Sequence, residues 1–281
     1  MCEFCLKHGE GRKWYLEAKN YSEDLLSDLR RRKFIADFAS DVDTIRAGAE
    51  KMKLLDRVPG FVRRVLSWGV SRRFKKMHFG QVVPIEDIER ILGFTNSVVR
   101  VACICRYATR GVDARYCYGV SMGPDGGIFG NLVEAPDSSY LKGPDGTRME
   151  NLSKKEALEL MHDHEREGLC HTVWTFITPF IGGICNCDRT DCMAMRATVG
   201  HGMRVMFRAE YVAETDPDRC TGCRACTRIC QFGAMGFSAA RKKVEIDPKR
   251  CFGCGSCRSV CPQQAIALRA RRDVESAKNL W

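Results

Sequence analysis

Eight cysteines in the C-terminal quarter of the chain form two runs with the same spacing, C-x2-C-x2-C-x3-C. The first run is Cys220, Cys223, Cys226 and Cys230, and the second is Cys251, Cys254, Cys257 and Cys261. A cubane cluster needs four thiolates around it, and three cysteines on a tight loop can each hold one corner while the fourth comes from elsewhere. The spacing therefore predicts two [4Fe-4S] clusters, whose chemistry is the transfer of single electrons.

The duplication extends beyond the thiols. Residues 218–237 align with residues 249–268 without a gap, so that Gly222 matches Gly253. Self-similarity of this kind indicates duplicated supersecondary units that share one core, and the glycines permit the close backbone approach that a cluster needs. Residues 243–247 alternate between polar and apolar side chains, as a strand does.

This repeat resembles the bacterial-type two-cluster ferredoxins, in which the fourth cysteine of each run ligates the cluster of the other run. The resemblance implies one cluster held by Cys220, Cys223, Cys226 and Cys261, and a second held by Cys251, Cys254, Cys257 and Cys230. Pro262 follows Cys261 as the family pattern requires, whereas Gln231 replaces the proline expected after Cys230. The departure restores a backbone N–H beside one cluster, and the ligand set survives it.

Structural zinc and disulfides account for the repeat less well. Structural zinc sites usually use two C-x2-C pairs that are well separated in sequence, rather than two intact runs of four cysteines. A disulfide framework suits small secreted chains, whereas this chain has 281 residues, and Met1 leads straight into Cys2 without an export leader. We therefore expect a cytoplasmic protein, whose 17 cysteines indicate metal binding rather than disulfides.

Nine further cysteines lie outside the repeat, and four of them form C-x-C pairs. Cys103 and Cys105 follow the apolar run 97–102, which we expect to be a strand. Cys185 and Cys187 follow a second apolar stretch that contains two glycines. These glycines and the polar residues 188–191 predict a turn that lets the thiols of the second pair converge.

We expect at least one additional cluster in this part of the chain. Its candidate ligands are Cys103, Cys105, Cys185, Cys187 and Cys192. The alternative is that several of these residues are buried free thiols, which is a common state for cysteine. Cys117 and Cys170 are the strongest candidates for free thiols, although either could complete a ligand set.

A predicted helix would bring another pair of polar residues to the same place. Ser153 and Glu156 form a capping box at the start of residues 154–167, and a glycine at position 168 ends that helix. Cys170 and His171 follow at once and lead into a strand-like run over residues 172–177. The helix would therefore deliver both side chains close to the strands that carry the C-x-C pairs.

Together these motifs resemble a family of multicluster iron–sulfur proteins that carry a cysteine-rich N-terminal domain before a two-cluster ferredoxin domain. The matching elements are C-x-C-R at 103–106, G-L-x-H at 168–171, I-C-N-C at 184–187 and the cysteines that open the chain. Family members often continue I-C-N-C with a denser group of cysteines, whereas this chain has Asp188, Arg189, Thr190 and Asp191 before Cys192. The resemblance implies an electron-transfer iron–sulfur subunit and fixes no substrate.

The start of the chain is a second candidate metal site. Cys2, Cys5 and His8 have the spacing C-x2-C-x2-H, and all three side chains are of types that ligate metals. Mixed cysteine and histidine sets suit zinc, and a further cubane is an equal alternative. A fourth ligand would have to come from elsewhere. The remaining interpretation is a flexible terminus with incidental thiols.

The fold class that we predict is α+β. A mostly helical N-terminal region spans residues 1–95, and a cysteine-rich domain of mixed α/β structure spans 96–211. A ferredoxin-like dicluster domain built from a βαβ repeat spans 212–270, and 271–281 form a C-terminal tail. The residues that precede the dicluster domain are numerous enough to bury a core of their own.

The positive charge of the chain does not indicate a nucleic-acid partner. The formal net charge is +10, but each bound cubane contributes about −2, so that two clusters bring the total to about +6 and four to about +2. No nucleic-acid-binding motif accompanies the charge. No apolar run is long enough to span a bilayer, and we expect membrane association only at the periphery.

One predicted helix, over residues 61–77, mixes apolar and basic side chains. Phe61, Val65 and Leu66 begin an apolar pattern with helical spacing, and arginines and lysines fill the gaps. The simplest expectation is that the apolar stripe packs on its own domain. Docking on an acidic partner protein or on an anionic membrane surface are the alternatives.

These features favour an electron-transfer subunit that passes single electrons between partner oxidoreductases in a larger complex. The alternative is an oxidoreductase whose N-terminal domain holds an open-site cluster or cofactor, near Asp188, Arg189 or His171, that the ferredoxin unit supplies with electrons. A third interpretation is a redox-sensing or interaction module in which metal sites only hold the fold. The sequence shows no nucleophile–base pair, phosphate loop or dinucleotide fingerprint, and we assign no catalytic residue.

Overall fold

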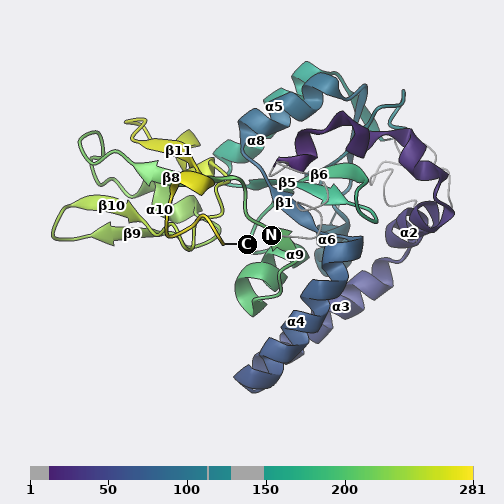
Figure 1. The fold of residues 1–281 in the computed structure, drawn as a ribbon, viewed down its shortest axis with the longest axis horizontal. Coiled ribbons are helices and arrows are strands. Elements are labelled where there is room, and N and C mark those ends of the chain that lie inside the picture. The colour runs from purple at the N-terminus through teal and green to yellow at the C-terminus, as the bar shows by residue number, and fades with distance from the viewer. Residues whose placement is uncertain (1–12, 113, 128–148, 281) are drawn as a thin grey trace.

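The structure combines helices with three β-sheets, which confirms the α+β class (Figure 1). It is a computed structural model that describes residues 13–112, 114–127 and 149–280. The candidate site formed by Cys2, Cys5 and His8 lies outside the described residues. In the described part of the chain, no helix is long and apolar enough to cross a membrane.

Seven strands form the main sheet, in the order β4-β2-β3-β6-β5-β1-β7. They are β1 (Gly80–Val82), β2 (Ser97–Val101), β3 (Cys117–Ser121), β4 (Glu150–Leu152), β5 (Cys170–Thr175), β6 (Ile181–Cys187) and β7 (Met206–Phe207). Neighbouring strands run antiparallel, except that β1 and β7 are parallel. The strands predicted over 97–102 and 172–177 are thereby found, although β5 begins two residues earlier than expected.

Helices cover both faces of this sheet. They are α2 (Leu29–Ser40), α3 (Val42–Leu54), α4 (Gly60–Met77), α5 (Ile85–Phe94), α6 (Ile104–Arg110), α8 (Lys154–Arg166), α9 (Met193–Met195) and the π-helix η6 (Arg196–Gly200). Short 3-10 helices are η1 (Trp14–Leu16), η2 (Ala18–Tyr21), η3 (Glu23–Ser27), η4 (Leu55–Arg57) and η7 (Arg271–Asp273). The predicted helix over 154–167 is α8, and its capping box is present with both hydrogen bonds.

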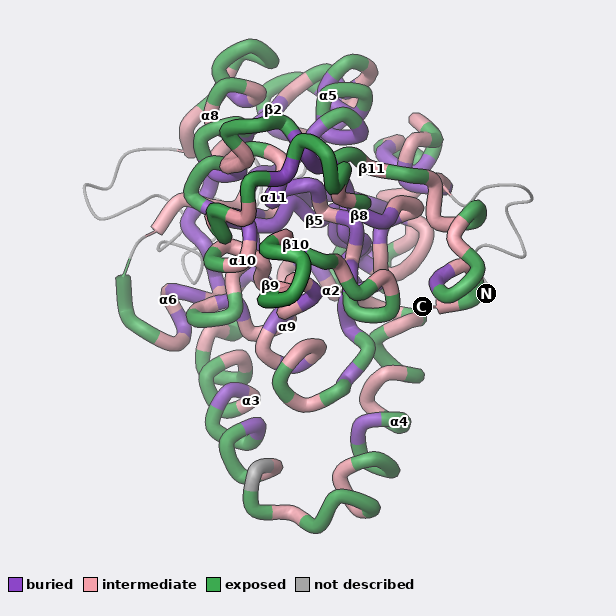
Figure 2. Tube along the Cα trace, turned by 90° about the vertical axis from the view of Figure 1, so that its left-hand side faces the viewer, coloured by how far each residue is buried: buried purple, intermediate pink, exposed green. Residues whose placement is uncertain are grey.

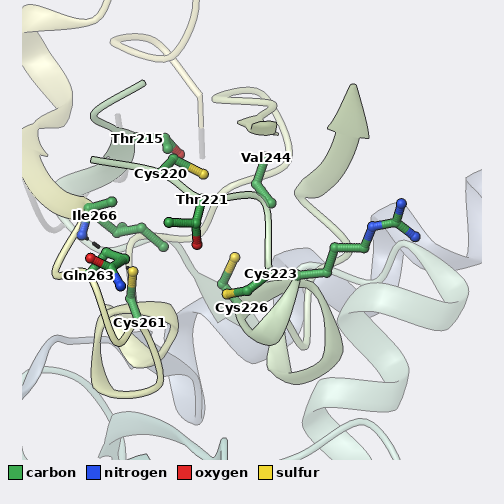
Figure 3. Close-up of a pocket in the computed structure, with 11 residues that line it drawn as sticks. Thr215, Cys220, Thr221, Cys223, Cys226, Val244, Cys261, Gln263 and Ile266 are labelled. Carbon is green, nitrogen blue, oxygen red and sulfur yellow. Dashed lines mark hydrogen bonds between the residues drawn. The ribbon is translucent and has the colours of Figure 1, made fainter. Parts of the chain in front are cut away.

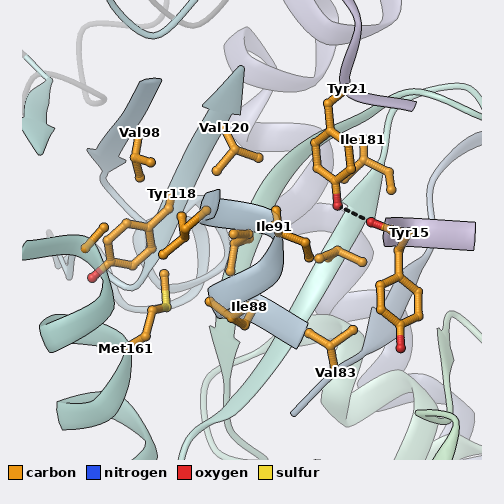
Figure 4. Close-up of a cluster of buried hydrophobic side chains, with 14 of the residues drawn as sticks. Tyr15, Tyr21, Val83, Ile88, Ile91, Val98, Tyr118, Val120, Met161 and Ile181 are labelled. Carbon is orange, nitrogen blue, oxygen red and sulfur yellow. Dashed lines mark hydrogen bonds between the residues drawn. The ribbon is translucent and has the colours of Figure 1, made fainter. Parts of the chain in front are cut away.

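The main core lies between the sheet and the helices α5 and α8 (Figure 4). Ile88 and Ile91 of α5 and Met161 of α8 are fully buried there. Tyr15 and Tyr21 from the N-terminal 3-10 helices complete the same core, and the Tyr21 hydroxyl donates a hydrogen bond to the Tyr15 carbonyl oxygen at 2.7 Å. The core therefore crosses residue 95, where the sequence placed a domain boundary, because segments on both sides of it bury the same sheet face.

The C-terminal unit consists of two β-α-β halves. The first is β8 (Tyr211–Thr215), α10 (Ala225–Ile229) and β9 (Met235–Ser238), and the second is β10 (Lys243–Ile246), α11 (Ser256–Ser259) and β11 (Ile266–Ala270). The halves interlock, because β8 pairs with β11 and β9 pairs with β10, both antiparallel. This is the βαβ repeat that the sequence predicts, and it forms a lobe at one side of the molecule (Figure 1).

Each half of the unit turns on a glycine at the same position of the repeat. Gly222 and Gly253 both have φ of 71°, in the left-handed region that favours glycine. A Cβ at Gly253 would lie 2.1 Å from the carbonyl oxygen of Tyr211, and a Cβ at Gly222 would lie 2.3 Å from that of Lys242. The neighbouring backbone therefore leaves no room for a side chain.

The expectation that the apolar stripe of α4 packs on its own domain is wrong for the N-terminal half of that helix. Phe61, Val65 and Trp68 are 75%, 67% and 64% exposed. Together α3 and α4 form a V that extends away from the sheet and is largely exposed toward its tip (Figure 2). From Ser67 onward α4 is anchored on other faces, for example by Ser67 itself, which is buried, and by Val70, which packs against the core beneath the sheet.

The glycine geometry predicts the cost of a side chain at position 253. We expect Gly253→Ala to lower the free energy of unfolding by at least about 2 kcal/mol, because the strained φ and the clash with a backbone oxygen act together. Urea unfolding of the anaerobically purified protein measures the change. Gly69→Ala is the matched control, since Gly69 lies in α4 with open space around it, and it should raise stability by roughly 0.5–1 kcal/mol. Equal stability of Gly253→Ala and wild type would contradict this expectation.

Candidate metal centre

Four thiols line a cavity at the outer end of the C-terminal unit, which we call the outer site (Figure 3). They belong to Cys220, Cys223, Cys226 and Cys261. The apolar side chains of Val244 and Ile266 and the hydroxyl-bearing Thr215 also line it. Cys223 is exposed whereas Cys220 and Cys226 are buried, so that one ligand position of this site reaches the protein surface.

A second cavity, the inner site, lies on the side of the unit that faces the sheet. Its thiols belong to Cys230, Cys251, Cys254 and Cys257. Phe232 and Phe252 also line it, with their rings stacked at a centroid distance of 4.1 Å. In both cavities three thiols of one run meet the last thiol of the other run. The structure thus gathers the cysteines as the predicted ligand assignment requires, and ligation itself stays a prediction.

The surroundings of these thiols suit a cluster held by thiolates. The backbone N–H groups of Ala234 and Ala265 donate to the sulfurs of Cys230 and Cys261, each at 3.3 Å. These two hydrogen bonds occupy equivalent positions of the repeat. The N–H groups of Ala213 and Gly253 both donate to Cys251 at 3.4 Å. Donors aimed at sulfur stabilise negative charge there, and hydrogen bonds of this kind tune cluster potentials.

Basic residues lie close to the outer site. The guanidinium of Arg224, which lines the cavity, lies 3.7 Å from the centre of the Phe237 ring. Lys243 donates to the carbonyl oxygen of Cys220, and Lys242 beside it is exposed. A positively charged rim attracts an acidic surface and offsets part of the negative charge of a bound cluster.

A third collection of cysteines, which we call the six-thiol group, lies beside the main sheet. Its members are Cys103, Cys105, Cys117, Cys185, Cys187 and Cys192. The sulfurs of Cys117 and Cys185 are 3.3 Å apart, and Cys192 contacts both Cys105 and Cys187. All five predicted candidates for an additional cluster are therefore brought together, and Cys117 joins them.

Strand register explains this convergence. Cys117 on β3 lies directly opposite Cys185 on β6. Cys185 and Cys187 lie on one face of β6 without a turn, because residues two apart in a strand point to the same face. The expectation that the pair needs a turn in order to converge was therefore wrong. The polar residues 188–191 do turn, with the N–H of Asp191 donating to Asp188 Oδ1 at 2.6 Å. This turn returns the chain so that Cys192 reaches the group.

A buried arginine supplies positive charge to the six-thiol group. Arg106 is 3% exposed, and its Nη1 lies 3.5 Å from Cys103 Sγ. The same guanidinium pairs with Asp188 and lies 4.2 Å from the ring centre of Tyr116. Contacts with Cys105 and Cys117 hold the pKa of the Cys103 thiol well below its usual range, and the charge of Arg106 adds to the effect. The arginine of the C-x-C-R element thus stabilises anionic sulfur.

Cys170 connects the six-thiol group with the inner site. On β5 it lies directly opposite Cys187 of β6. It is fully buried, and its thiol donates to the carbonyl oxygen of His171 at 3.7 Å. The neighbouring side chains of Cys170 and Ser256 hold the pKa of the Cys254 thiol at about 6, below its usual value, and Ser256 Oγ donates to Cys254 Sγ at 3.5 Å. One continuous apolar core contains Cys170, Cys187, Cys192 and Phe232, with Cys254 packed against it.

Gln231 fastens the C-terminal unit to the same place. Its Nε2 donates to the carbonyl oxygen of Gly168 at 2.8 Å, and its Oε1 accepts from the N–H of Arg189 at 3.0 Å. One side chain next to Cys230 therefore holds both the loop before β5 and the loop after β6. The residue is conspicuous in the sequence, but this contact could not be predicted from it, since neither partner is near Gln231 in the chain.

His171 faces away from the thiols, because it neighbours Cys170 in the strand. Its Nδ1 lies 2.6 Å from Asn186 Oδ1, and burial lowers its pKa to about 4, so that the ring is neutral. The expectation that His171 comes close to the C-x-C strands is met in position, yet its side chain lies on the opposite sheet face from Cys170.

A site for a single metal ion, such as zinc, differs in geometry from a site for an iron–sulfur cluster. Within residues 13–112, 114–127 and 149–280, no three histidine, cysteine, aspartate or glutamate side chains are arranged to hold one metal ion. Zinc therefore stays a prediction for the chain start alone.

The comparisons with known proteins agree with this geometry for the C-terminal unit. Residues 219–265 match the family model of the 4Fe-4S dicluster domain. None of the curated proteins matches the chain. The matched segment contains both cysteine runs, whose thiols line the outer and inner sites. We conclude that the chain is an iron–sulfur protein that carries a ferredoxin-type 4Fe-4S dicluster domain.

Proposed function

We propose that this protein is the electron-transfer subunit of an oxidoreductase complex, and that single electrons pass through it from cluster to cluster. The observation that carries the proposal is one buried core that contains Cys187 and Cys192 of the six-thiol group and against which Cys230 and Cys254 of the inner site pack. Cys170 lies in this core between the two sets of thiols, opposite Cys187 in the sheet. A free carrier would need little beyond the dicluster domain. Here the domain is instead fixed to a larger body that gathers further cysteines.

The exposure of the thiols suggests an order along this path. Cys223 of the outer site is exposed, whereas Cys251 and Cys257 of the inner site are buried. The outer site is thus the point of exchange with a redox partner, and its rim of Arg224 and Lys242 favours a partner with an acidic surface. The inner site faces the six-thiol group. A cytoplasmic location of the exchange stays a prediction.

We further propose that the six-thiol group holds an additional iron–sulfur cluster. Four of its six thiols would suffice for a cubane. Arg106, buried against Cys103, offsets the negative charge that such a cluster adds in a place shielded from water.

The alternative, an enzyme with its own substrate, has less support. The sequence placed its open-site cluster or cofactor in the N-terminal domain near Asp188, Arg189 or His171, but Asp188 is paired with Arg106 and His171 is engaged by Asn186 on the sheet face away from the thiols. The reduction potentials of the clusters test a purely structural role for the metal. Clusters that only hold the fold would not change oxidation state within the physiological range of potentials.

Iron content tests the additional cluster. We expect Cys192→Ser to lose about four iron atoms per chain relative to wild type, because Cys192 contacts two other members of the six-thiol group, while the two clusters of the dicluster domain remain. Iron and sulfide analysis of anaerobically purified protein measures the loss. Cys170→Ser is the matched control, being a buried thiol beside the group that we do not assign as a ligand. Wild type with only about eight iron atoms, the content of two cubanes, would refute the additional cluster.

The contact between Cys170 and Cys254 predicts a change of potential. The Cys170 side chain lowers the pKa of the Cys254 thiol and so stabilises negative charge on this sulfur, and its loss therefore makes the reduced, more negative cluster less stable. We therefore expect Cys170→Ala to lower the ratio of reduced to oxidised inner cluster about fivefold at the wild-type midpoint potential. A redox titration that uses EPR as its readout measures the midpoint potential of the inner cluster.

Three controls define the outcome for Cys170. Cys170→Ser retains a polar side chain beside Cys254 and should stay close to wild type. Val173→Ala makes a cavity of similar size in the same strand but in the other core, and should leave both potentials unchanged. Cys223→Ser alters a predicted ligand of the outer site and so identifies its signal. An equal shift of both clusters in Cys170→Ala would show that the effect is structural and would remove Cys170 from the path.

A further inference from the structure

The N-terminal half of α4 exposes an apolar stripe that its own domain does not cover. Phe61, Val65 and Trp68 follow one another at intervals of four and three residues, and therefore share one helix face. Other faces hold the helix to the body. Val70, opposite the stripe, packs against the core. To one side, Ser67 Oγ donates to the His201 carbonyl oxygen at 3.2 Å and Ser71 Oγ accepts from the N–H of Arg204 at 2.7 Å. The stripe consequently points away from the protein.

The same helix carries charge of one sign. Between Gly60 and Met77 the sequence contains six basic residues and no aspartate or glutamate. The basic residues are Arg63, Arg64, Arg72, Arg73, Lys75 and Lys76. Arg72 lies one turn beyond Trp68, with its guanidinium 5.5 Å from the ring centre. Apolar side chains near the tip of the V are thus followed by cations along the helix toward the body.

We propose that α4 docks on an anionic lipid surface, with Phe61, Val65 and Trp68 entering the interfacial region and the basic residues meeting the headgroups. Aromatic and aliphatic side chains at this exposure are unusual on a free surface when they form one stripe. Six cations without any acid suit the uniform negative potential of anionic lipids better than a protein surface, where both signs alternate. Leu54, 56% exposed at the end of α3, extends the apolar tip. The helix lies on the membrane and does not span it.

Vesicle binding by the full chain tests the proposal. Wild type should sediment with vesicles of phosphatidylcholine and phosphatidylglycerol, bind neutral phosphatidylcholine vesicles much more weakly, and dissociate as salt is raised. The double variant Phe61→Ser/Trp68→Ser should bind the anionic vesicles about a hundredfold more weakly. Arg72→Glu/Lys76→Glu should lose the preference for anionic lipid. Leu29→Ser is the control, because Leu29 is a 74% exposed apolar residue of α2 outside the stripe, and it should bind as wild type does.

Each contrary result overturns the proposal in a defined way. Equal binding by wild type and the Phe61→Ser/Trp68→Ser variant would place lipid binding elsewhere on the protein. Absence of vesicle binding, combined with self-association that the double variant abolishes, would assign the stripe to a second copy of this chain. Absence of both would leave an acidic partner protein as the occupant. The vesicles contain no redox partner, so the result does not depend on the electron-transfer function.

Discussion

The pairing of β5 with β6 is the constraint on which the arrangement of sites depends. Its register places Cys170 opposite Cys187 and Thr172 opposite Cys185, which turns three thiols toward one sheet face. That face is also where the inner site of the dicluster domain packs. A slip of one residue would move every side chain of β5 to the opposite face. Cys170 would then lose Cys254, and His171 would be turned toward the thiols in its place.

Negative charge on a buried sulfur must be stabilised, and the interaction that stabilises it differs from site to site. In the dicluster domain the donors are backbone N–H groups that the repeat places identically at Cys230 and Cys261. At the inner site Cys170 and Ser256 lower the pKa of the Cys254 thiol, and Ser256 Oγ donates to its sulfur at 3.5 Å. In the six-thiol group the device is a whole cation, Arg106, held by Asp188. A full charge is suited to a place where the strands leave few backbone donors free.

Local spacing was sufficient to predict the dicluster domain, α8 with its cap, and the members of the six-thiol group that lie in C-x-C pairs. It could not find Cys117 or Cys170, because their partners are set by strand register between distant segments. The exposure of α4 was missed for a related reason. Its apolar pattern is that of any packed helix, and only the geometry shows that the packed face, with Ser67 and Val70, is not the face with Phe61 and Trp68.

Gln231 shows how a departure from a family pattern can follow from position in the molecule. At the outer site the equivalent residue is Pro262, which is exposed. At the inner site a proline could not reach Gly168 and Arg189, whereas a glutamine side chain bonds both. Gly168 is close enough that a Cβ there would lie 3.0 Å from Ile229 Cβ. The substitution therefore occurs in the half of the repeat that contacts the cysteine-rich body, and it holds the inner site against Cys170.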